Sequence, residues 1–238
     1  MLQPLTPHIV FDCLALLLAI VAGIISVRWK LKSPMTRTAA GIGAGYFIAL
    51  SLGSMTGSFA LGTANLYLSG VSNIGRSIAG ALFGATLTVE LYKLQRGTRG
   101  STGYMYVIPF CVLVIVGRLG CFFSGLADHT YGTPTTLPWG VDFGDGMQRH
   151  PVQLYESLSM LMLLMFVIFM LRVRQQFIVD YGYYLCVGFY GGQRFLWEFL
   201  KPYAALLGSL NLFHIICLLL MIYSIAMSLG VRNGYRTT

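Results

Sequence analysis

The sequence predicts an all-α polytopic membrane protein, with about seven transmembrane helices in a single transmembrane domain that covers residues 1–238. Hydrophobic residues make up 56% of the chain and charged residues only 10%, which leaves too little polar surface to cover a water-soluble globule of this size. Seven apolar runs, separated by polar stretches, also approach the length that spans a bilayer. We therefore expect lipid to surround most of this chain.

Each apolar run is interpreted as one membrane-crossing helix, because about 20 apolar residues in a helix span the hydrocarbon core. The first run is followed, not preceded, by a basic cluster, so we expect it to be retained rather than removed as a signal peptide. Gly41 with Gly45, Gly53 with Gly57, and Gly80 with Gly84 have the spacing of helices that pack closely in lipid. The runs lie near residues 9–28, 39–59, 74–92, 103–120, 151–171, 180–199 and 207–229.

The basic residues predict the orientation of the helices. Because lysine and arginine are enriched in cytoplasmic loops, the N-terminus is expected outside and the C-terminus, after seven crossings, in the cytoplasm. The basic residues do not follow one face, so no nucleic acid partner is expected. Eleven of the 16 basic residues fall in the loops assigned to the cytoplasm: Arg28, Lys30, Lys32, Arg37, Lys93, Arg96, Arg99, Arg172, Arg174, Arg232 and Arg236.

One connection is long and polar. Residues 121–150 are rich in glycine, proline and aspartate and are expected to form an external loop between the fourth and fifth helices. His8 and His214 have no charged neighbours in the sequence and are expected at the interface or in the core. The cysteines have no CxxC or CxxH spacing, so neither a zinc site nor a disulfide framework is predicted. The five are Cys13, Cys111, Cys121, Cys186 and Cys217.

Several arginines fall at membrane depth. Arg76 opens the third helix, Arg118 closes the fourth and Arg194 lies near the end of the sixth, level with Arg149 and His150 in the predicted topology. An arginine in a span is costly unless it faces a partner, a cavity or an anion. Guanidinium groups donate paired hydrogen bonds to phosphate oxygens and keep their charge when partly desolvated. The pattern therefore indicates a site for a phospholipid headgroup.

The sixth helix has polar residues on one face. Tyr190, Arg194 and Glu198 follow each other at i, i+4 positions, which places a phenol, a guanidinium and a carboxylate in one column. The alternative to ligand binding is that Arg194 with Glu198, and Arg118 with Glu156, are ion pairs that hold helices together.

The fifth helix begins at His150 and Pro151, since proline suits the first helical turn. Gln153 and Glu156, three residues apart, share one face of this helix, while Tyr155 points partly elsewhere. His129 and His150 lie at the external loop, where histidine side chains are expected to exchange protons near neutral pH.

Three segments resemble the motifs of the prolipoprotein diacylglyceryl transferases, the enzymes that begin bacterial lipoprotein maturation. They are Gly117–Phe122 (GRLGCF), His150–Glu156 (HPVQLYE) and Gly191–Phe199 (GGQRFLWEF). The resemblance extends from about Asn73 to Lys201. It implies seven crossings with an external N-terminus and a place in the bacterial cytoplasmic (inner) membrane.

The resemblance also implies a reaction. A diacylglyceryl group passes from phosphatidylglycerol to the lipobox cysteine thiol in the signal peptide of a prolipoprotein, forming a thioether and releasing glycerol phosphate. No metal and no organic cofactor are implied. By position in the motifs, Arg118 contacts phosphatidylglycerol and Arg194 shares in neutralising the departing phosphate, while Glu198 and Glu156 orient them.

The chain departs from the family pattern at the headgroup pocket. Ala79 stands where the family has the histidine of a His-Gly-Gly motif, Cys121 and Ser124 replace two asparagines, and Leu126 replaces an acidic residue. His150 is a candidate replacement for the missing base. The catalytic candidates are thus Arg118, Arg194, Glu198 and His150, and the substrate-binding candidates are Arg118, Arg76, Gly80, Cys121, Ser124, Gln153, Tyr155, Glu156 and Tyr190.

Three alternatives remain open. A catalytically silent phospholipid-binding relative would keep the arginines without a base, as Ala79 favours. A transferase with a different acceptor would share the lipid site. A transporter is less favoured, because the sequence has neither two-fold internal symmetry nor paired broken helices.

Overall fold

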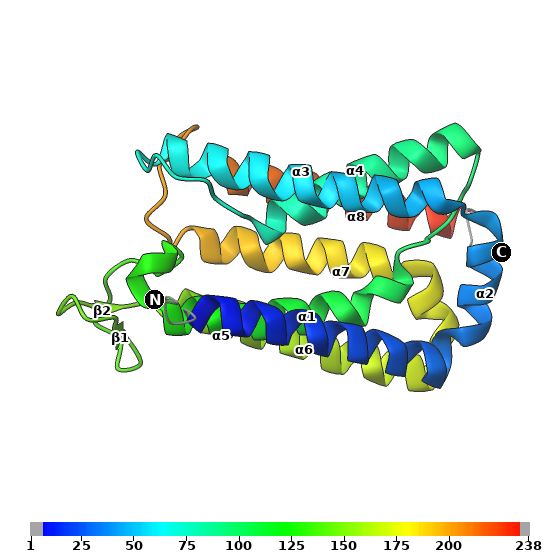
Figure 1. Ribbon diagram of the computed structural model, residues 1–238, viewed down its shortest axis with the longest axis horizontal. Coiled ribbons are helices and arrows are strands. Elements are labelled where there is room, and N and C mark those ends of the chain that lie inside the picture. Colours follow the sequence, from blue (N-terminus) through cyan, green and yellow to red (C-terminus); the bar gives the residue numbers. More distant parts are fainter. Residues whose placement is uncertain (1–6, 234–238) are drawn as a thin grey trace, which may run out of the picture.

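The computed structural model describes residues 7–233, so Arg236 lies outside the described residues. Within them, seven long α-helices run back and forth along one axis, and α1 begins at the opposite end of the bundle from the end of α8 (Figure 1). Each long helix corresponds to one predicted apolar run, with shifted boundaries. They are α1 (Pro7–Ser26), α3 (Ala44–Leu68), α4 (Ile78–Arg96), α5 (Val107–Ser124), α6 (Val152–Val173), α7 (Gln175–Glu198) and α8 (Leu212–Arg232).

Shorter elements join the long helices. One of them, α2, crosses the end of the bundle between α1 and α3, where the sequence analysis expected part of a loop (Figure 1). The all-α prediction also missed a small hairpin between α5 and α6. The short elements are η1 (Val27–Leu31), α2 (Lys32–Gly41), η2 (Tyr104–Tyr106), η3 (Gly125–Asp128), β1 (Val141–Asp142) and β2 (Gln148–Arg149).

The expectation of a helical membrane protein is confirmed. Among the described residues, five helical segments are long and apolar enough to cross a membrane. The helices α4, with 19 residues, and α7, with 24, carry three charged residues each, which lowers their mean hydropathy. The five segments are His8–Ala39, Ala44–Leu68, Tyr104–Asp128, Val152–Val173 and Leu212–Arg232.

The helix α7 lies at the centre of the bundle, with α3, α4 and α8 on one side and α1, α5 and α6 on the other (Figure 1). Its inward residues are buried among apolar side chains of the neighbouring helices, such as Val114 of α5 and Met160 of α6. Large apolar side chains such as Leu17, Leu158 and Ile225 are exposed on outer faces, as expected of helices in lipid. The central position explains why α7 tolerates a polar face.

The helices α3 and α4 approach through the predicted glycine pairs. A Cβ atom added at Gly57 would lie 2.3 Å from the carbonyl oxygen of Gly80, and one added at Gly84 would lie 2.1 Å from that of Gly53. These distances are far below van der Waals contact, so only glycine permits the approach. The interpretation as packing sites is confirmed for these two pairs but not for Gly41 with Gly45, because nothing lies within 4 Å of a Cβ atom at Gly41. Gly80, a substrate-binding candidate, lies at the contact of α3 with α4.

Replacing Gly57 with alanine should therefore destabilise the protein. The new methyl group meets backbone, which cannot rotate away, and overpacking of this kind costs about 1–3 kcal/mol. Thermal unfolding in detergent measures the loss, with Gly41→Ala as the matched control because nothing lies within 4 Å of a Cβ atom there. Equal melting temperatures for the two variants would contradict the packing interpretation.

The segment between α3 and α4 runs back along α3 before α4 begins (Figure 1). Its backbone groups find partners on α3, since the Gly75 N–H donates to the Thr63 hydroxyl at 3.1 Å and the Ser77 N–H to the Ser58 carbonyl at 3.2 Å. Irregular backbone at membrane depth needs such partners, because lipid offers none. The Ser77 side chain then caps α4 by accepting from the Gly80 N–H at 3.1 Å.

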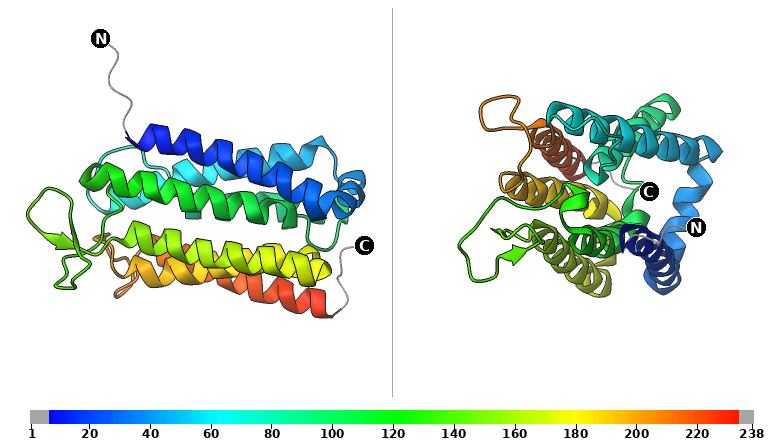
Figure 2. Two further views of the ribbon diagram at one scale, coloured as in Figure 1. Left: turned by 90° about the horizontal axis from the view of Figure 1, so that it is seen from below. Right: turned by 60° about the vertical axis from the view of Figure 1, so that its left-hand side comes forward.

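The connection predicted as a loop over 121–150 begins four residues later than expected, because α5 continues to Ser124 and η3 follows it. The hairpin β1–β2 projects from the end of the bundle where α5 ends and α6 begins (Figure 2). Its strands pair antiparallel, and the Thr133 N–H beside it donates to the Leu200 carbonyl at 2.7 Å. The Tyr203 hydroxyl donates to the His129 carbonyl at 2.9 Å. The loop is thus anchored on the segment that follows α7.

Candidate functional site

Five charged side chains meet inside the bundle at the end that carries the hairpin, and we call them the charged cluster. They come from the last turns of α5, the first turns of α6, the last turns of α7 and the segment after α7. Each is at most 5% exposed. The members of the charged cluster are Arg118, Glu156, Arg194, Glu198 and Lys201.

Glu156 is the centre of the charged cluster. Its Oε2 lies 2.5 Å from Arg118 Nε, and its Oε1 lies 2.8 Å from Lys201 Nζ and accepts a hydrogen bond from Arg194 Nη1. One carboxylate therefore pairs with cations from three parts of the chain. Burial without these partners would be prohibitive, since a buried charge left alone costs several kcal/mol.

Glu198 completes the charged cluster from the end of α7. Its Oε2 lies 2.9 Å from Arg194 Nε and its Oε1 accepts from Asn211 Nδ2 at 3.1 Å. The predicted i, i+4 pair on α7 is present, as is the predicted pair of Arg118 with Glu156. Arg118 with Glu156 joins α5 to α6, as the structural alternative expected, whereas Arg194 and Glu198 pair within α7. The link between α6 and α7 is the pair of Arg194 with Glu156.

The charged cluster keeps a net positive charge after its ion pairs are counted. Three cations face two carboxylates, which leaves one positive charge in excess in a buried environment. Arg194 also lies under the ring of Phe213, with its Cζ 5.4 Å from the ring centroid. An excess cation among apolar side chains attracts an anion more strongly than it would in water.

Buried polar groups line the same helix faces. The side-chain amide of Gln153, three residues before Glu156, is fully buried, and neither of its polar atoms has a hydrogen-bond partner among the described residues. The same holds for the amide of Gln193 and the hydroxyl of Tyr190, four residues before Arg194. Buried polar atoms are nearly always paired with protein, water or ligand. Water or a polar ligand is therefore expected to supply the partners of these groups.

Two predicted residues lie away from the charged cluster. The side chain of Arg76 is 61% exposed and its Nη2 lies 3.5 Å from Asp12 Oδ2 of α1. Gly80 packs against Gly57, as described above. Of the arginines predicted at one membrane depth, Arg118 and Arg194 thus meet in the charged cluster, whereas Arg76 lies against α1.

Three further candidates make local contacts. His150 Nδ1 lies 3.4 Å from the hydroxyl of Tyr155, which accepts from Trp139 Nε1 at 2.9 Å. The hydroxyl of Ser124 donates to the Gly120 carbonyl of its own helix at 2.9 Å. His150 and Tyr155 thus form an aromatic group with Trp197 beside the start of α6.

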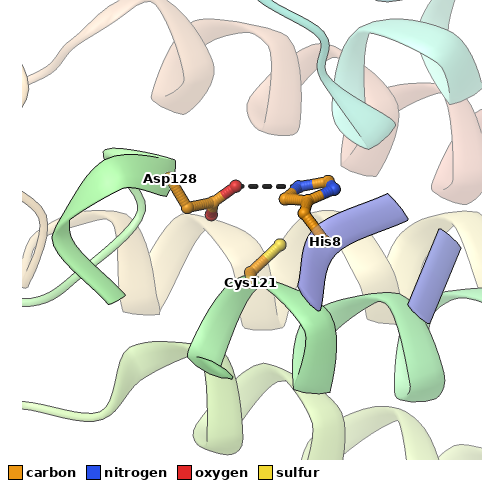
Figure 3. Close-up of side chains that lie close together, drawn as sticks. All are labelled: His8, Cys121 and Asp128. Carbon is orange, nitrogen blue, oxygen red and sulfur yellow. Dashed lines mark ion pairs between the residues drawn. The ribbon is translucent and has the colours of Figure 1, made fainter. Parts of the chain in front are cut away.

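Cys121 joins two residues that the sequence analysis did not select, His8 of α1 and Asp128 of η3. Figure 3 shows the three side chains pointing toward one another. Arg118 Nη1 lies 3.9 Å from the Cys121 sulfur, so this group adjoins the charged cluster. The expectation that His8 has no charged partner is wrong, because His8 Nδ1 lies 2.9 Å from Asp12 and Nε2 lies 2.9 Å from Asp128.

The signals for the missed residues differ in kind. Asp12 lies four residues after His8, a helical spacing that could have been read from the sequence. The pairing of Asp128 with His8 could not have been read from the sequence, because it depends on the packing of α1 on α5. His214, in contrast, is 1% exposed, and its Nδ1 lies 3.0 Å from the side-chain oxygen of Asn211 at the start of its own helix, as expected of a core residue.

Lys201 was also missed as a site residue, since the sequence places it just past the sixth apolar run. Burial lowers its pKa to about 8, because the cost of desolvation and the repulsion of Arg194 outweigh the attraction of Glu156 and Glu198. Lys201 is therefore the cation of the charged cluster whose charge changes near neutral pH.

This shift predicts a pH dependence of stability. Between pH 8 and pH 10.5 the unfolded chain keeps the Lys201 proton that the folded protein has lost, so the free energy of unfolding should rise with pH. The contribution is at most about 1.4 kcal/mol per pH unit. Melting curves of the wild type and of Lys201→Met in detergent are compared from pH 7.5 to pH 10. The difference between the two pH profiles gives the contribution of Lys201. Parallel pH profiles for the two proteins would contradict the lowered pKa.

A cavity of about 690 Å³ lies elsewhere, between α4 and α8. Glu90 and Lys93 line it, with Lys93 Nζ 2.9 Å from Glu90 Oε1, and the hydroxyl of Tyr223 donates to the same oxygen at 2.7 Å. Its lining includes none of the site residues predicted from the sequence. Lys93, expected in a loop, is 3% exposed within α4.

Comparison with known proteins gives consistent matches. The chain is 34% identical over 132 residues to the phosphatidylglycerol–prolipoprotein diacylglyceryl transferase of Coxiella burnetii. This match covers 53% of this chain and 48% of that protein. The enzyme of the same name from Geobacter sulfurreducens is 34% identical over 143 residues, covering 57% and 52%. The one from Finegoldia magna is 26% identical over 161 residues, covering 67% and 62%.

The chain matches about half the length of the first two relatives, and no solved structure matches it. The family comparison extends further. The sequence profile described as prolipoprotein diacylglyceryl transferase matches residues 8–229, which include α1 and most of α8 together with the charged cluster. The chain therefore belongs to the prolipoprotein diacylglyceryl transferase family.

Proposed function

We propose that this chain transfers a diacylglyceryl group from phosphatidylglycerol to the lipobox cysteine of a prolipoprotein. The thiol sulfur bonds to the glyceryl carbon, the carbon–oxygen bond to the phosphate breaks, and glycerol phosphate leaves. The curated relatives have names that state both phosphatidylglycerol and prolipoprotein. The site candidates that meet in the charged cluster come from all three segments that resemble the family.

The observation that carries the proposal is the excess positive charge of the charged cluster. Arg118 and Arg194 can each donate to phosphate oxygens with the guanidinium atoms that Glu156 and Glu198 do not occupy. Charge grows on the phosphate as glycerol phosphate departs, and fixed cations in a water-poor site stabilise that charge. Gln153 and Tyr190 offer polar atoms to the glycerol headgroup.

The proposed topology has seven crossings in the bacterial cytoplasmic membrane, with the N-terminus outside and the C-terminus in the cytoplasm. Seven long helices alternate in direction within residues 7–233 (Figure 2). The helices α4 and α7 cross in this arrangement because their charged residues, Lys93 and Arg194 among them, are buried against neighbouring helices. The positive-inside rule supports the orientation, and it places the charged cluster near the outer face.

A phospholipid-binding relative without transferase activity is the second candidate. Ala79, which stands in place of the family's histidine, is fully buried at the start of α4 and offers no proton acceptor. A protein of this kind would bind phosphatidylglycerol with the same arginines and stop there.

Mass spectrometry distinguishes the two candidates. The protein, purified in detergent, is incubated with phosphatidylglycerol and a lipobox peptide, and a peptide with serine in place of the cysteine is the control. A diacylglyceryl adduct on the cysteine peptide alone is the expected result. Bound phosphatidylglycerol without an adduct, while a known transferase works in parallel, would overturn the transferase and favour the lipid-binding protein.

A further inference from the structure

Three metal-ligating side chains from distant parts of the sequence converge where α1 begins and α5 ends (Figure 3). They are His8 of α1, Cys121 of α5 and Asp128 of η3, and their ligand atoms all lie within 4.8 Å of one another. His8 Nε2 and Asp128 Oδ1 are 2.9 Å apart. Helix packing, not sequence spacing, assembles this group, so the sequence predicted no metal site.

We propose that His8, Cys121 and Asp128 bind a Zn²⁺ ion. Zinc accepts nitrogen, sulfur and oxygen in one tetrahedral site, at about 2.0–2.3 Å, whereas Mg²⁺ and Ca²⁺ avoid thiolates. Tetrahedral zinc with these bond lengths sets a nitrogen and an oxygen ligand about 3.3 Å apart. The observed 2.9 Å between His8 Nε2 and Asp128 Oδ1 is close to that separation.

The surroundings of His8 match those of a metal ligand. Its second ring nitrogen, Nδ1, lies 2.9 Å from Asp12 Oδ2, and the same oxygen lies 3.5 Å from Arg76 Nη2. Metal-bound histidines commonly donate their other N–H to a carboxylate, which holds the ring in the tautomer that leaves the first nitrogen free. Asp12 is thus a positioning residue for the proposed ion.

Three protein ligands leave one position of a tetrahedral zinc ion open, as in catalytic and not in structural sites. The group is reached from outside the bundle at His8, whose side chain is 26% exposed, and is buried at Asp128, whose side chain is 9% exposed. Arg118 joins this site to the charged cluster, since it contacts both Glu156 and the Cys121 sulfur, the latter at 3.9 Å. A ligand at the open position would lie beside a phosphate held by Arg118.

The acceptor thiol fits this position, a step that rests on the proposed function. A thiol that binds zinc loses its proton, here to solvent, and becomes the nucleophilic thiolate. Its sulfur bonds to the glyceryl carbon of phosphatidylglycerol, the carbon–oxygen bond breaks, and the electron pair stays on the phosphate oxygen, which leaves as the glycerol phosphate dianion. The ion would thereby replace the proton acceptor that Ala79 lacks, without change of oxidation state.

Cobalt tests the site, because a thiolate bound to Co²⁺ absorbs in the near ultraviolet whereas zinc is silent. The full-length protein in detergent is stripped with a chelator, titrated with Co²⁺ and then with Zn²⁺. We expect one equivalent of Co²⁺, a thiolate band that Zn²⁺ abolishes, and loss of that band in Cys121→Ser. Cys13→Ser, at an exposed cysteine of α1, is the matched control and should keep it.

Two further variants separate metal binding from folding. Asp128→Asn should abolish binding, and Asp12→Asn should weaken it 10–100-fold, as loss of a carboxylate behind a histidine ligand does. Melting temperatures near that of the wild type establish that the variants are folded. The proposal is overturned if the folded wild type takes up no Co²⁺, or if Cys121→Ser keeps the thiolate band. His8 would then serve only to form ion pairs with Asp12 and Asp128.

The lipobox peptide then tests the open position. Without phosphatidylglycerol, the cysteine peptide should increase the thiolate band of the Co²⁺ protein, and the serine peptide should not. No increase would overturn the role of the ion in binding the acceptor. Transfer at the wild-type rate by stripped protein would overturn that role while the proposed function stands. A peptide-dependent band without transfer would leave the metal site standing and overturn the proposed function.

Discussion

Replacing Glu156 with glutamine should destabilise the protein by about 3–5 kcal/mol, the cost of breaking a buried ion pair by removing one partner. The loss is large because one carboxylate faces Arg118, Arg194 and Lys201, and an amide leaves three buried cations to a single carboxylate, Glu198. Thermal unfolding in detergent measures it. The folded fraction of the purified protein should also fall.

Asp145→Asn is the matched control, since Asp145 also pairs with an arginine, Arg149, but on the exposed hairpin. An exposed pair contributes at most about 1 kcal/mol, so this variant should melt close to the wild type. Removing Lys201 together with Glu156, as Glu156→Gln with Lys201→Met, should recover part of the lost stability because one uncompensated cation disappears. Similar losses in Glu156→Gln and Asp145→Asn would contradict the central role of Glu156.

Arg118→Ala should lower the rate of diacylglyceryl transfer at least 10²–10³-fold while the protein still inserts into the membrane. Removing one fixed donor to a developing anion has an effect of this size. Arg118 is the arginine that contacts both Glu156 and Cys121, so it lies between the proposed phosphate and the proposed thiol position. The rate of adduct formation on a lipobox peptide, followed by mass spectrometry, measures the loss.

Lysine at the same position separates charge from geometry. Arg118→Lys keeps the charge but cannot donate paired hydrogen bonds in one plane, so it should recover only part of the activity. Arg172→Ala is the control, because Arg172 lies over the ring of Trp29 at the far end of α6. Wild-type transfer by a folded Arg118→Ala protein would defeat the phosphate site, and full activity of Arg118→Lys would show that charge alone suffices.

The amino-acid sequence by itself determined the features that depend on residues close together along the chain. Long apolar runs predict helices because each helix satisfies its own backbone hydrogen bonds, and the polar column Tyr190, Arg194 and Glu198 follows from helical spacing alone. The glycine pairs of α3 and α4 predicted a close packing that the structure contains. The boundaries were less accurate, and α2 was missed because its polar sequence lacks an apolar run.

Tertiary structure decided which polar groups meet. Glu156 faces Lys201 and His8 faces Asp128 only because α6 packs on α7 and α1 packs on α5, and no local spacing encodes those neighbours. Packing likewise turned Arg76 away from the charged cluster toward Asp12. Helices are specified by contacts close in sequence, whereas a buried site needs contacts between distant segments, so the sequence named most of the charged cluster and the fold supplied Lys201 and the group around Cys121.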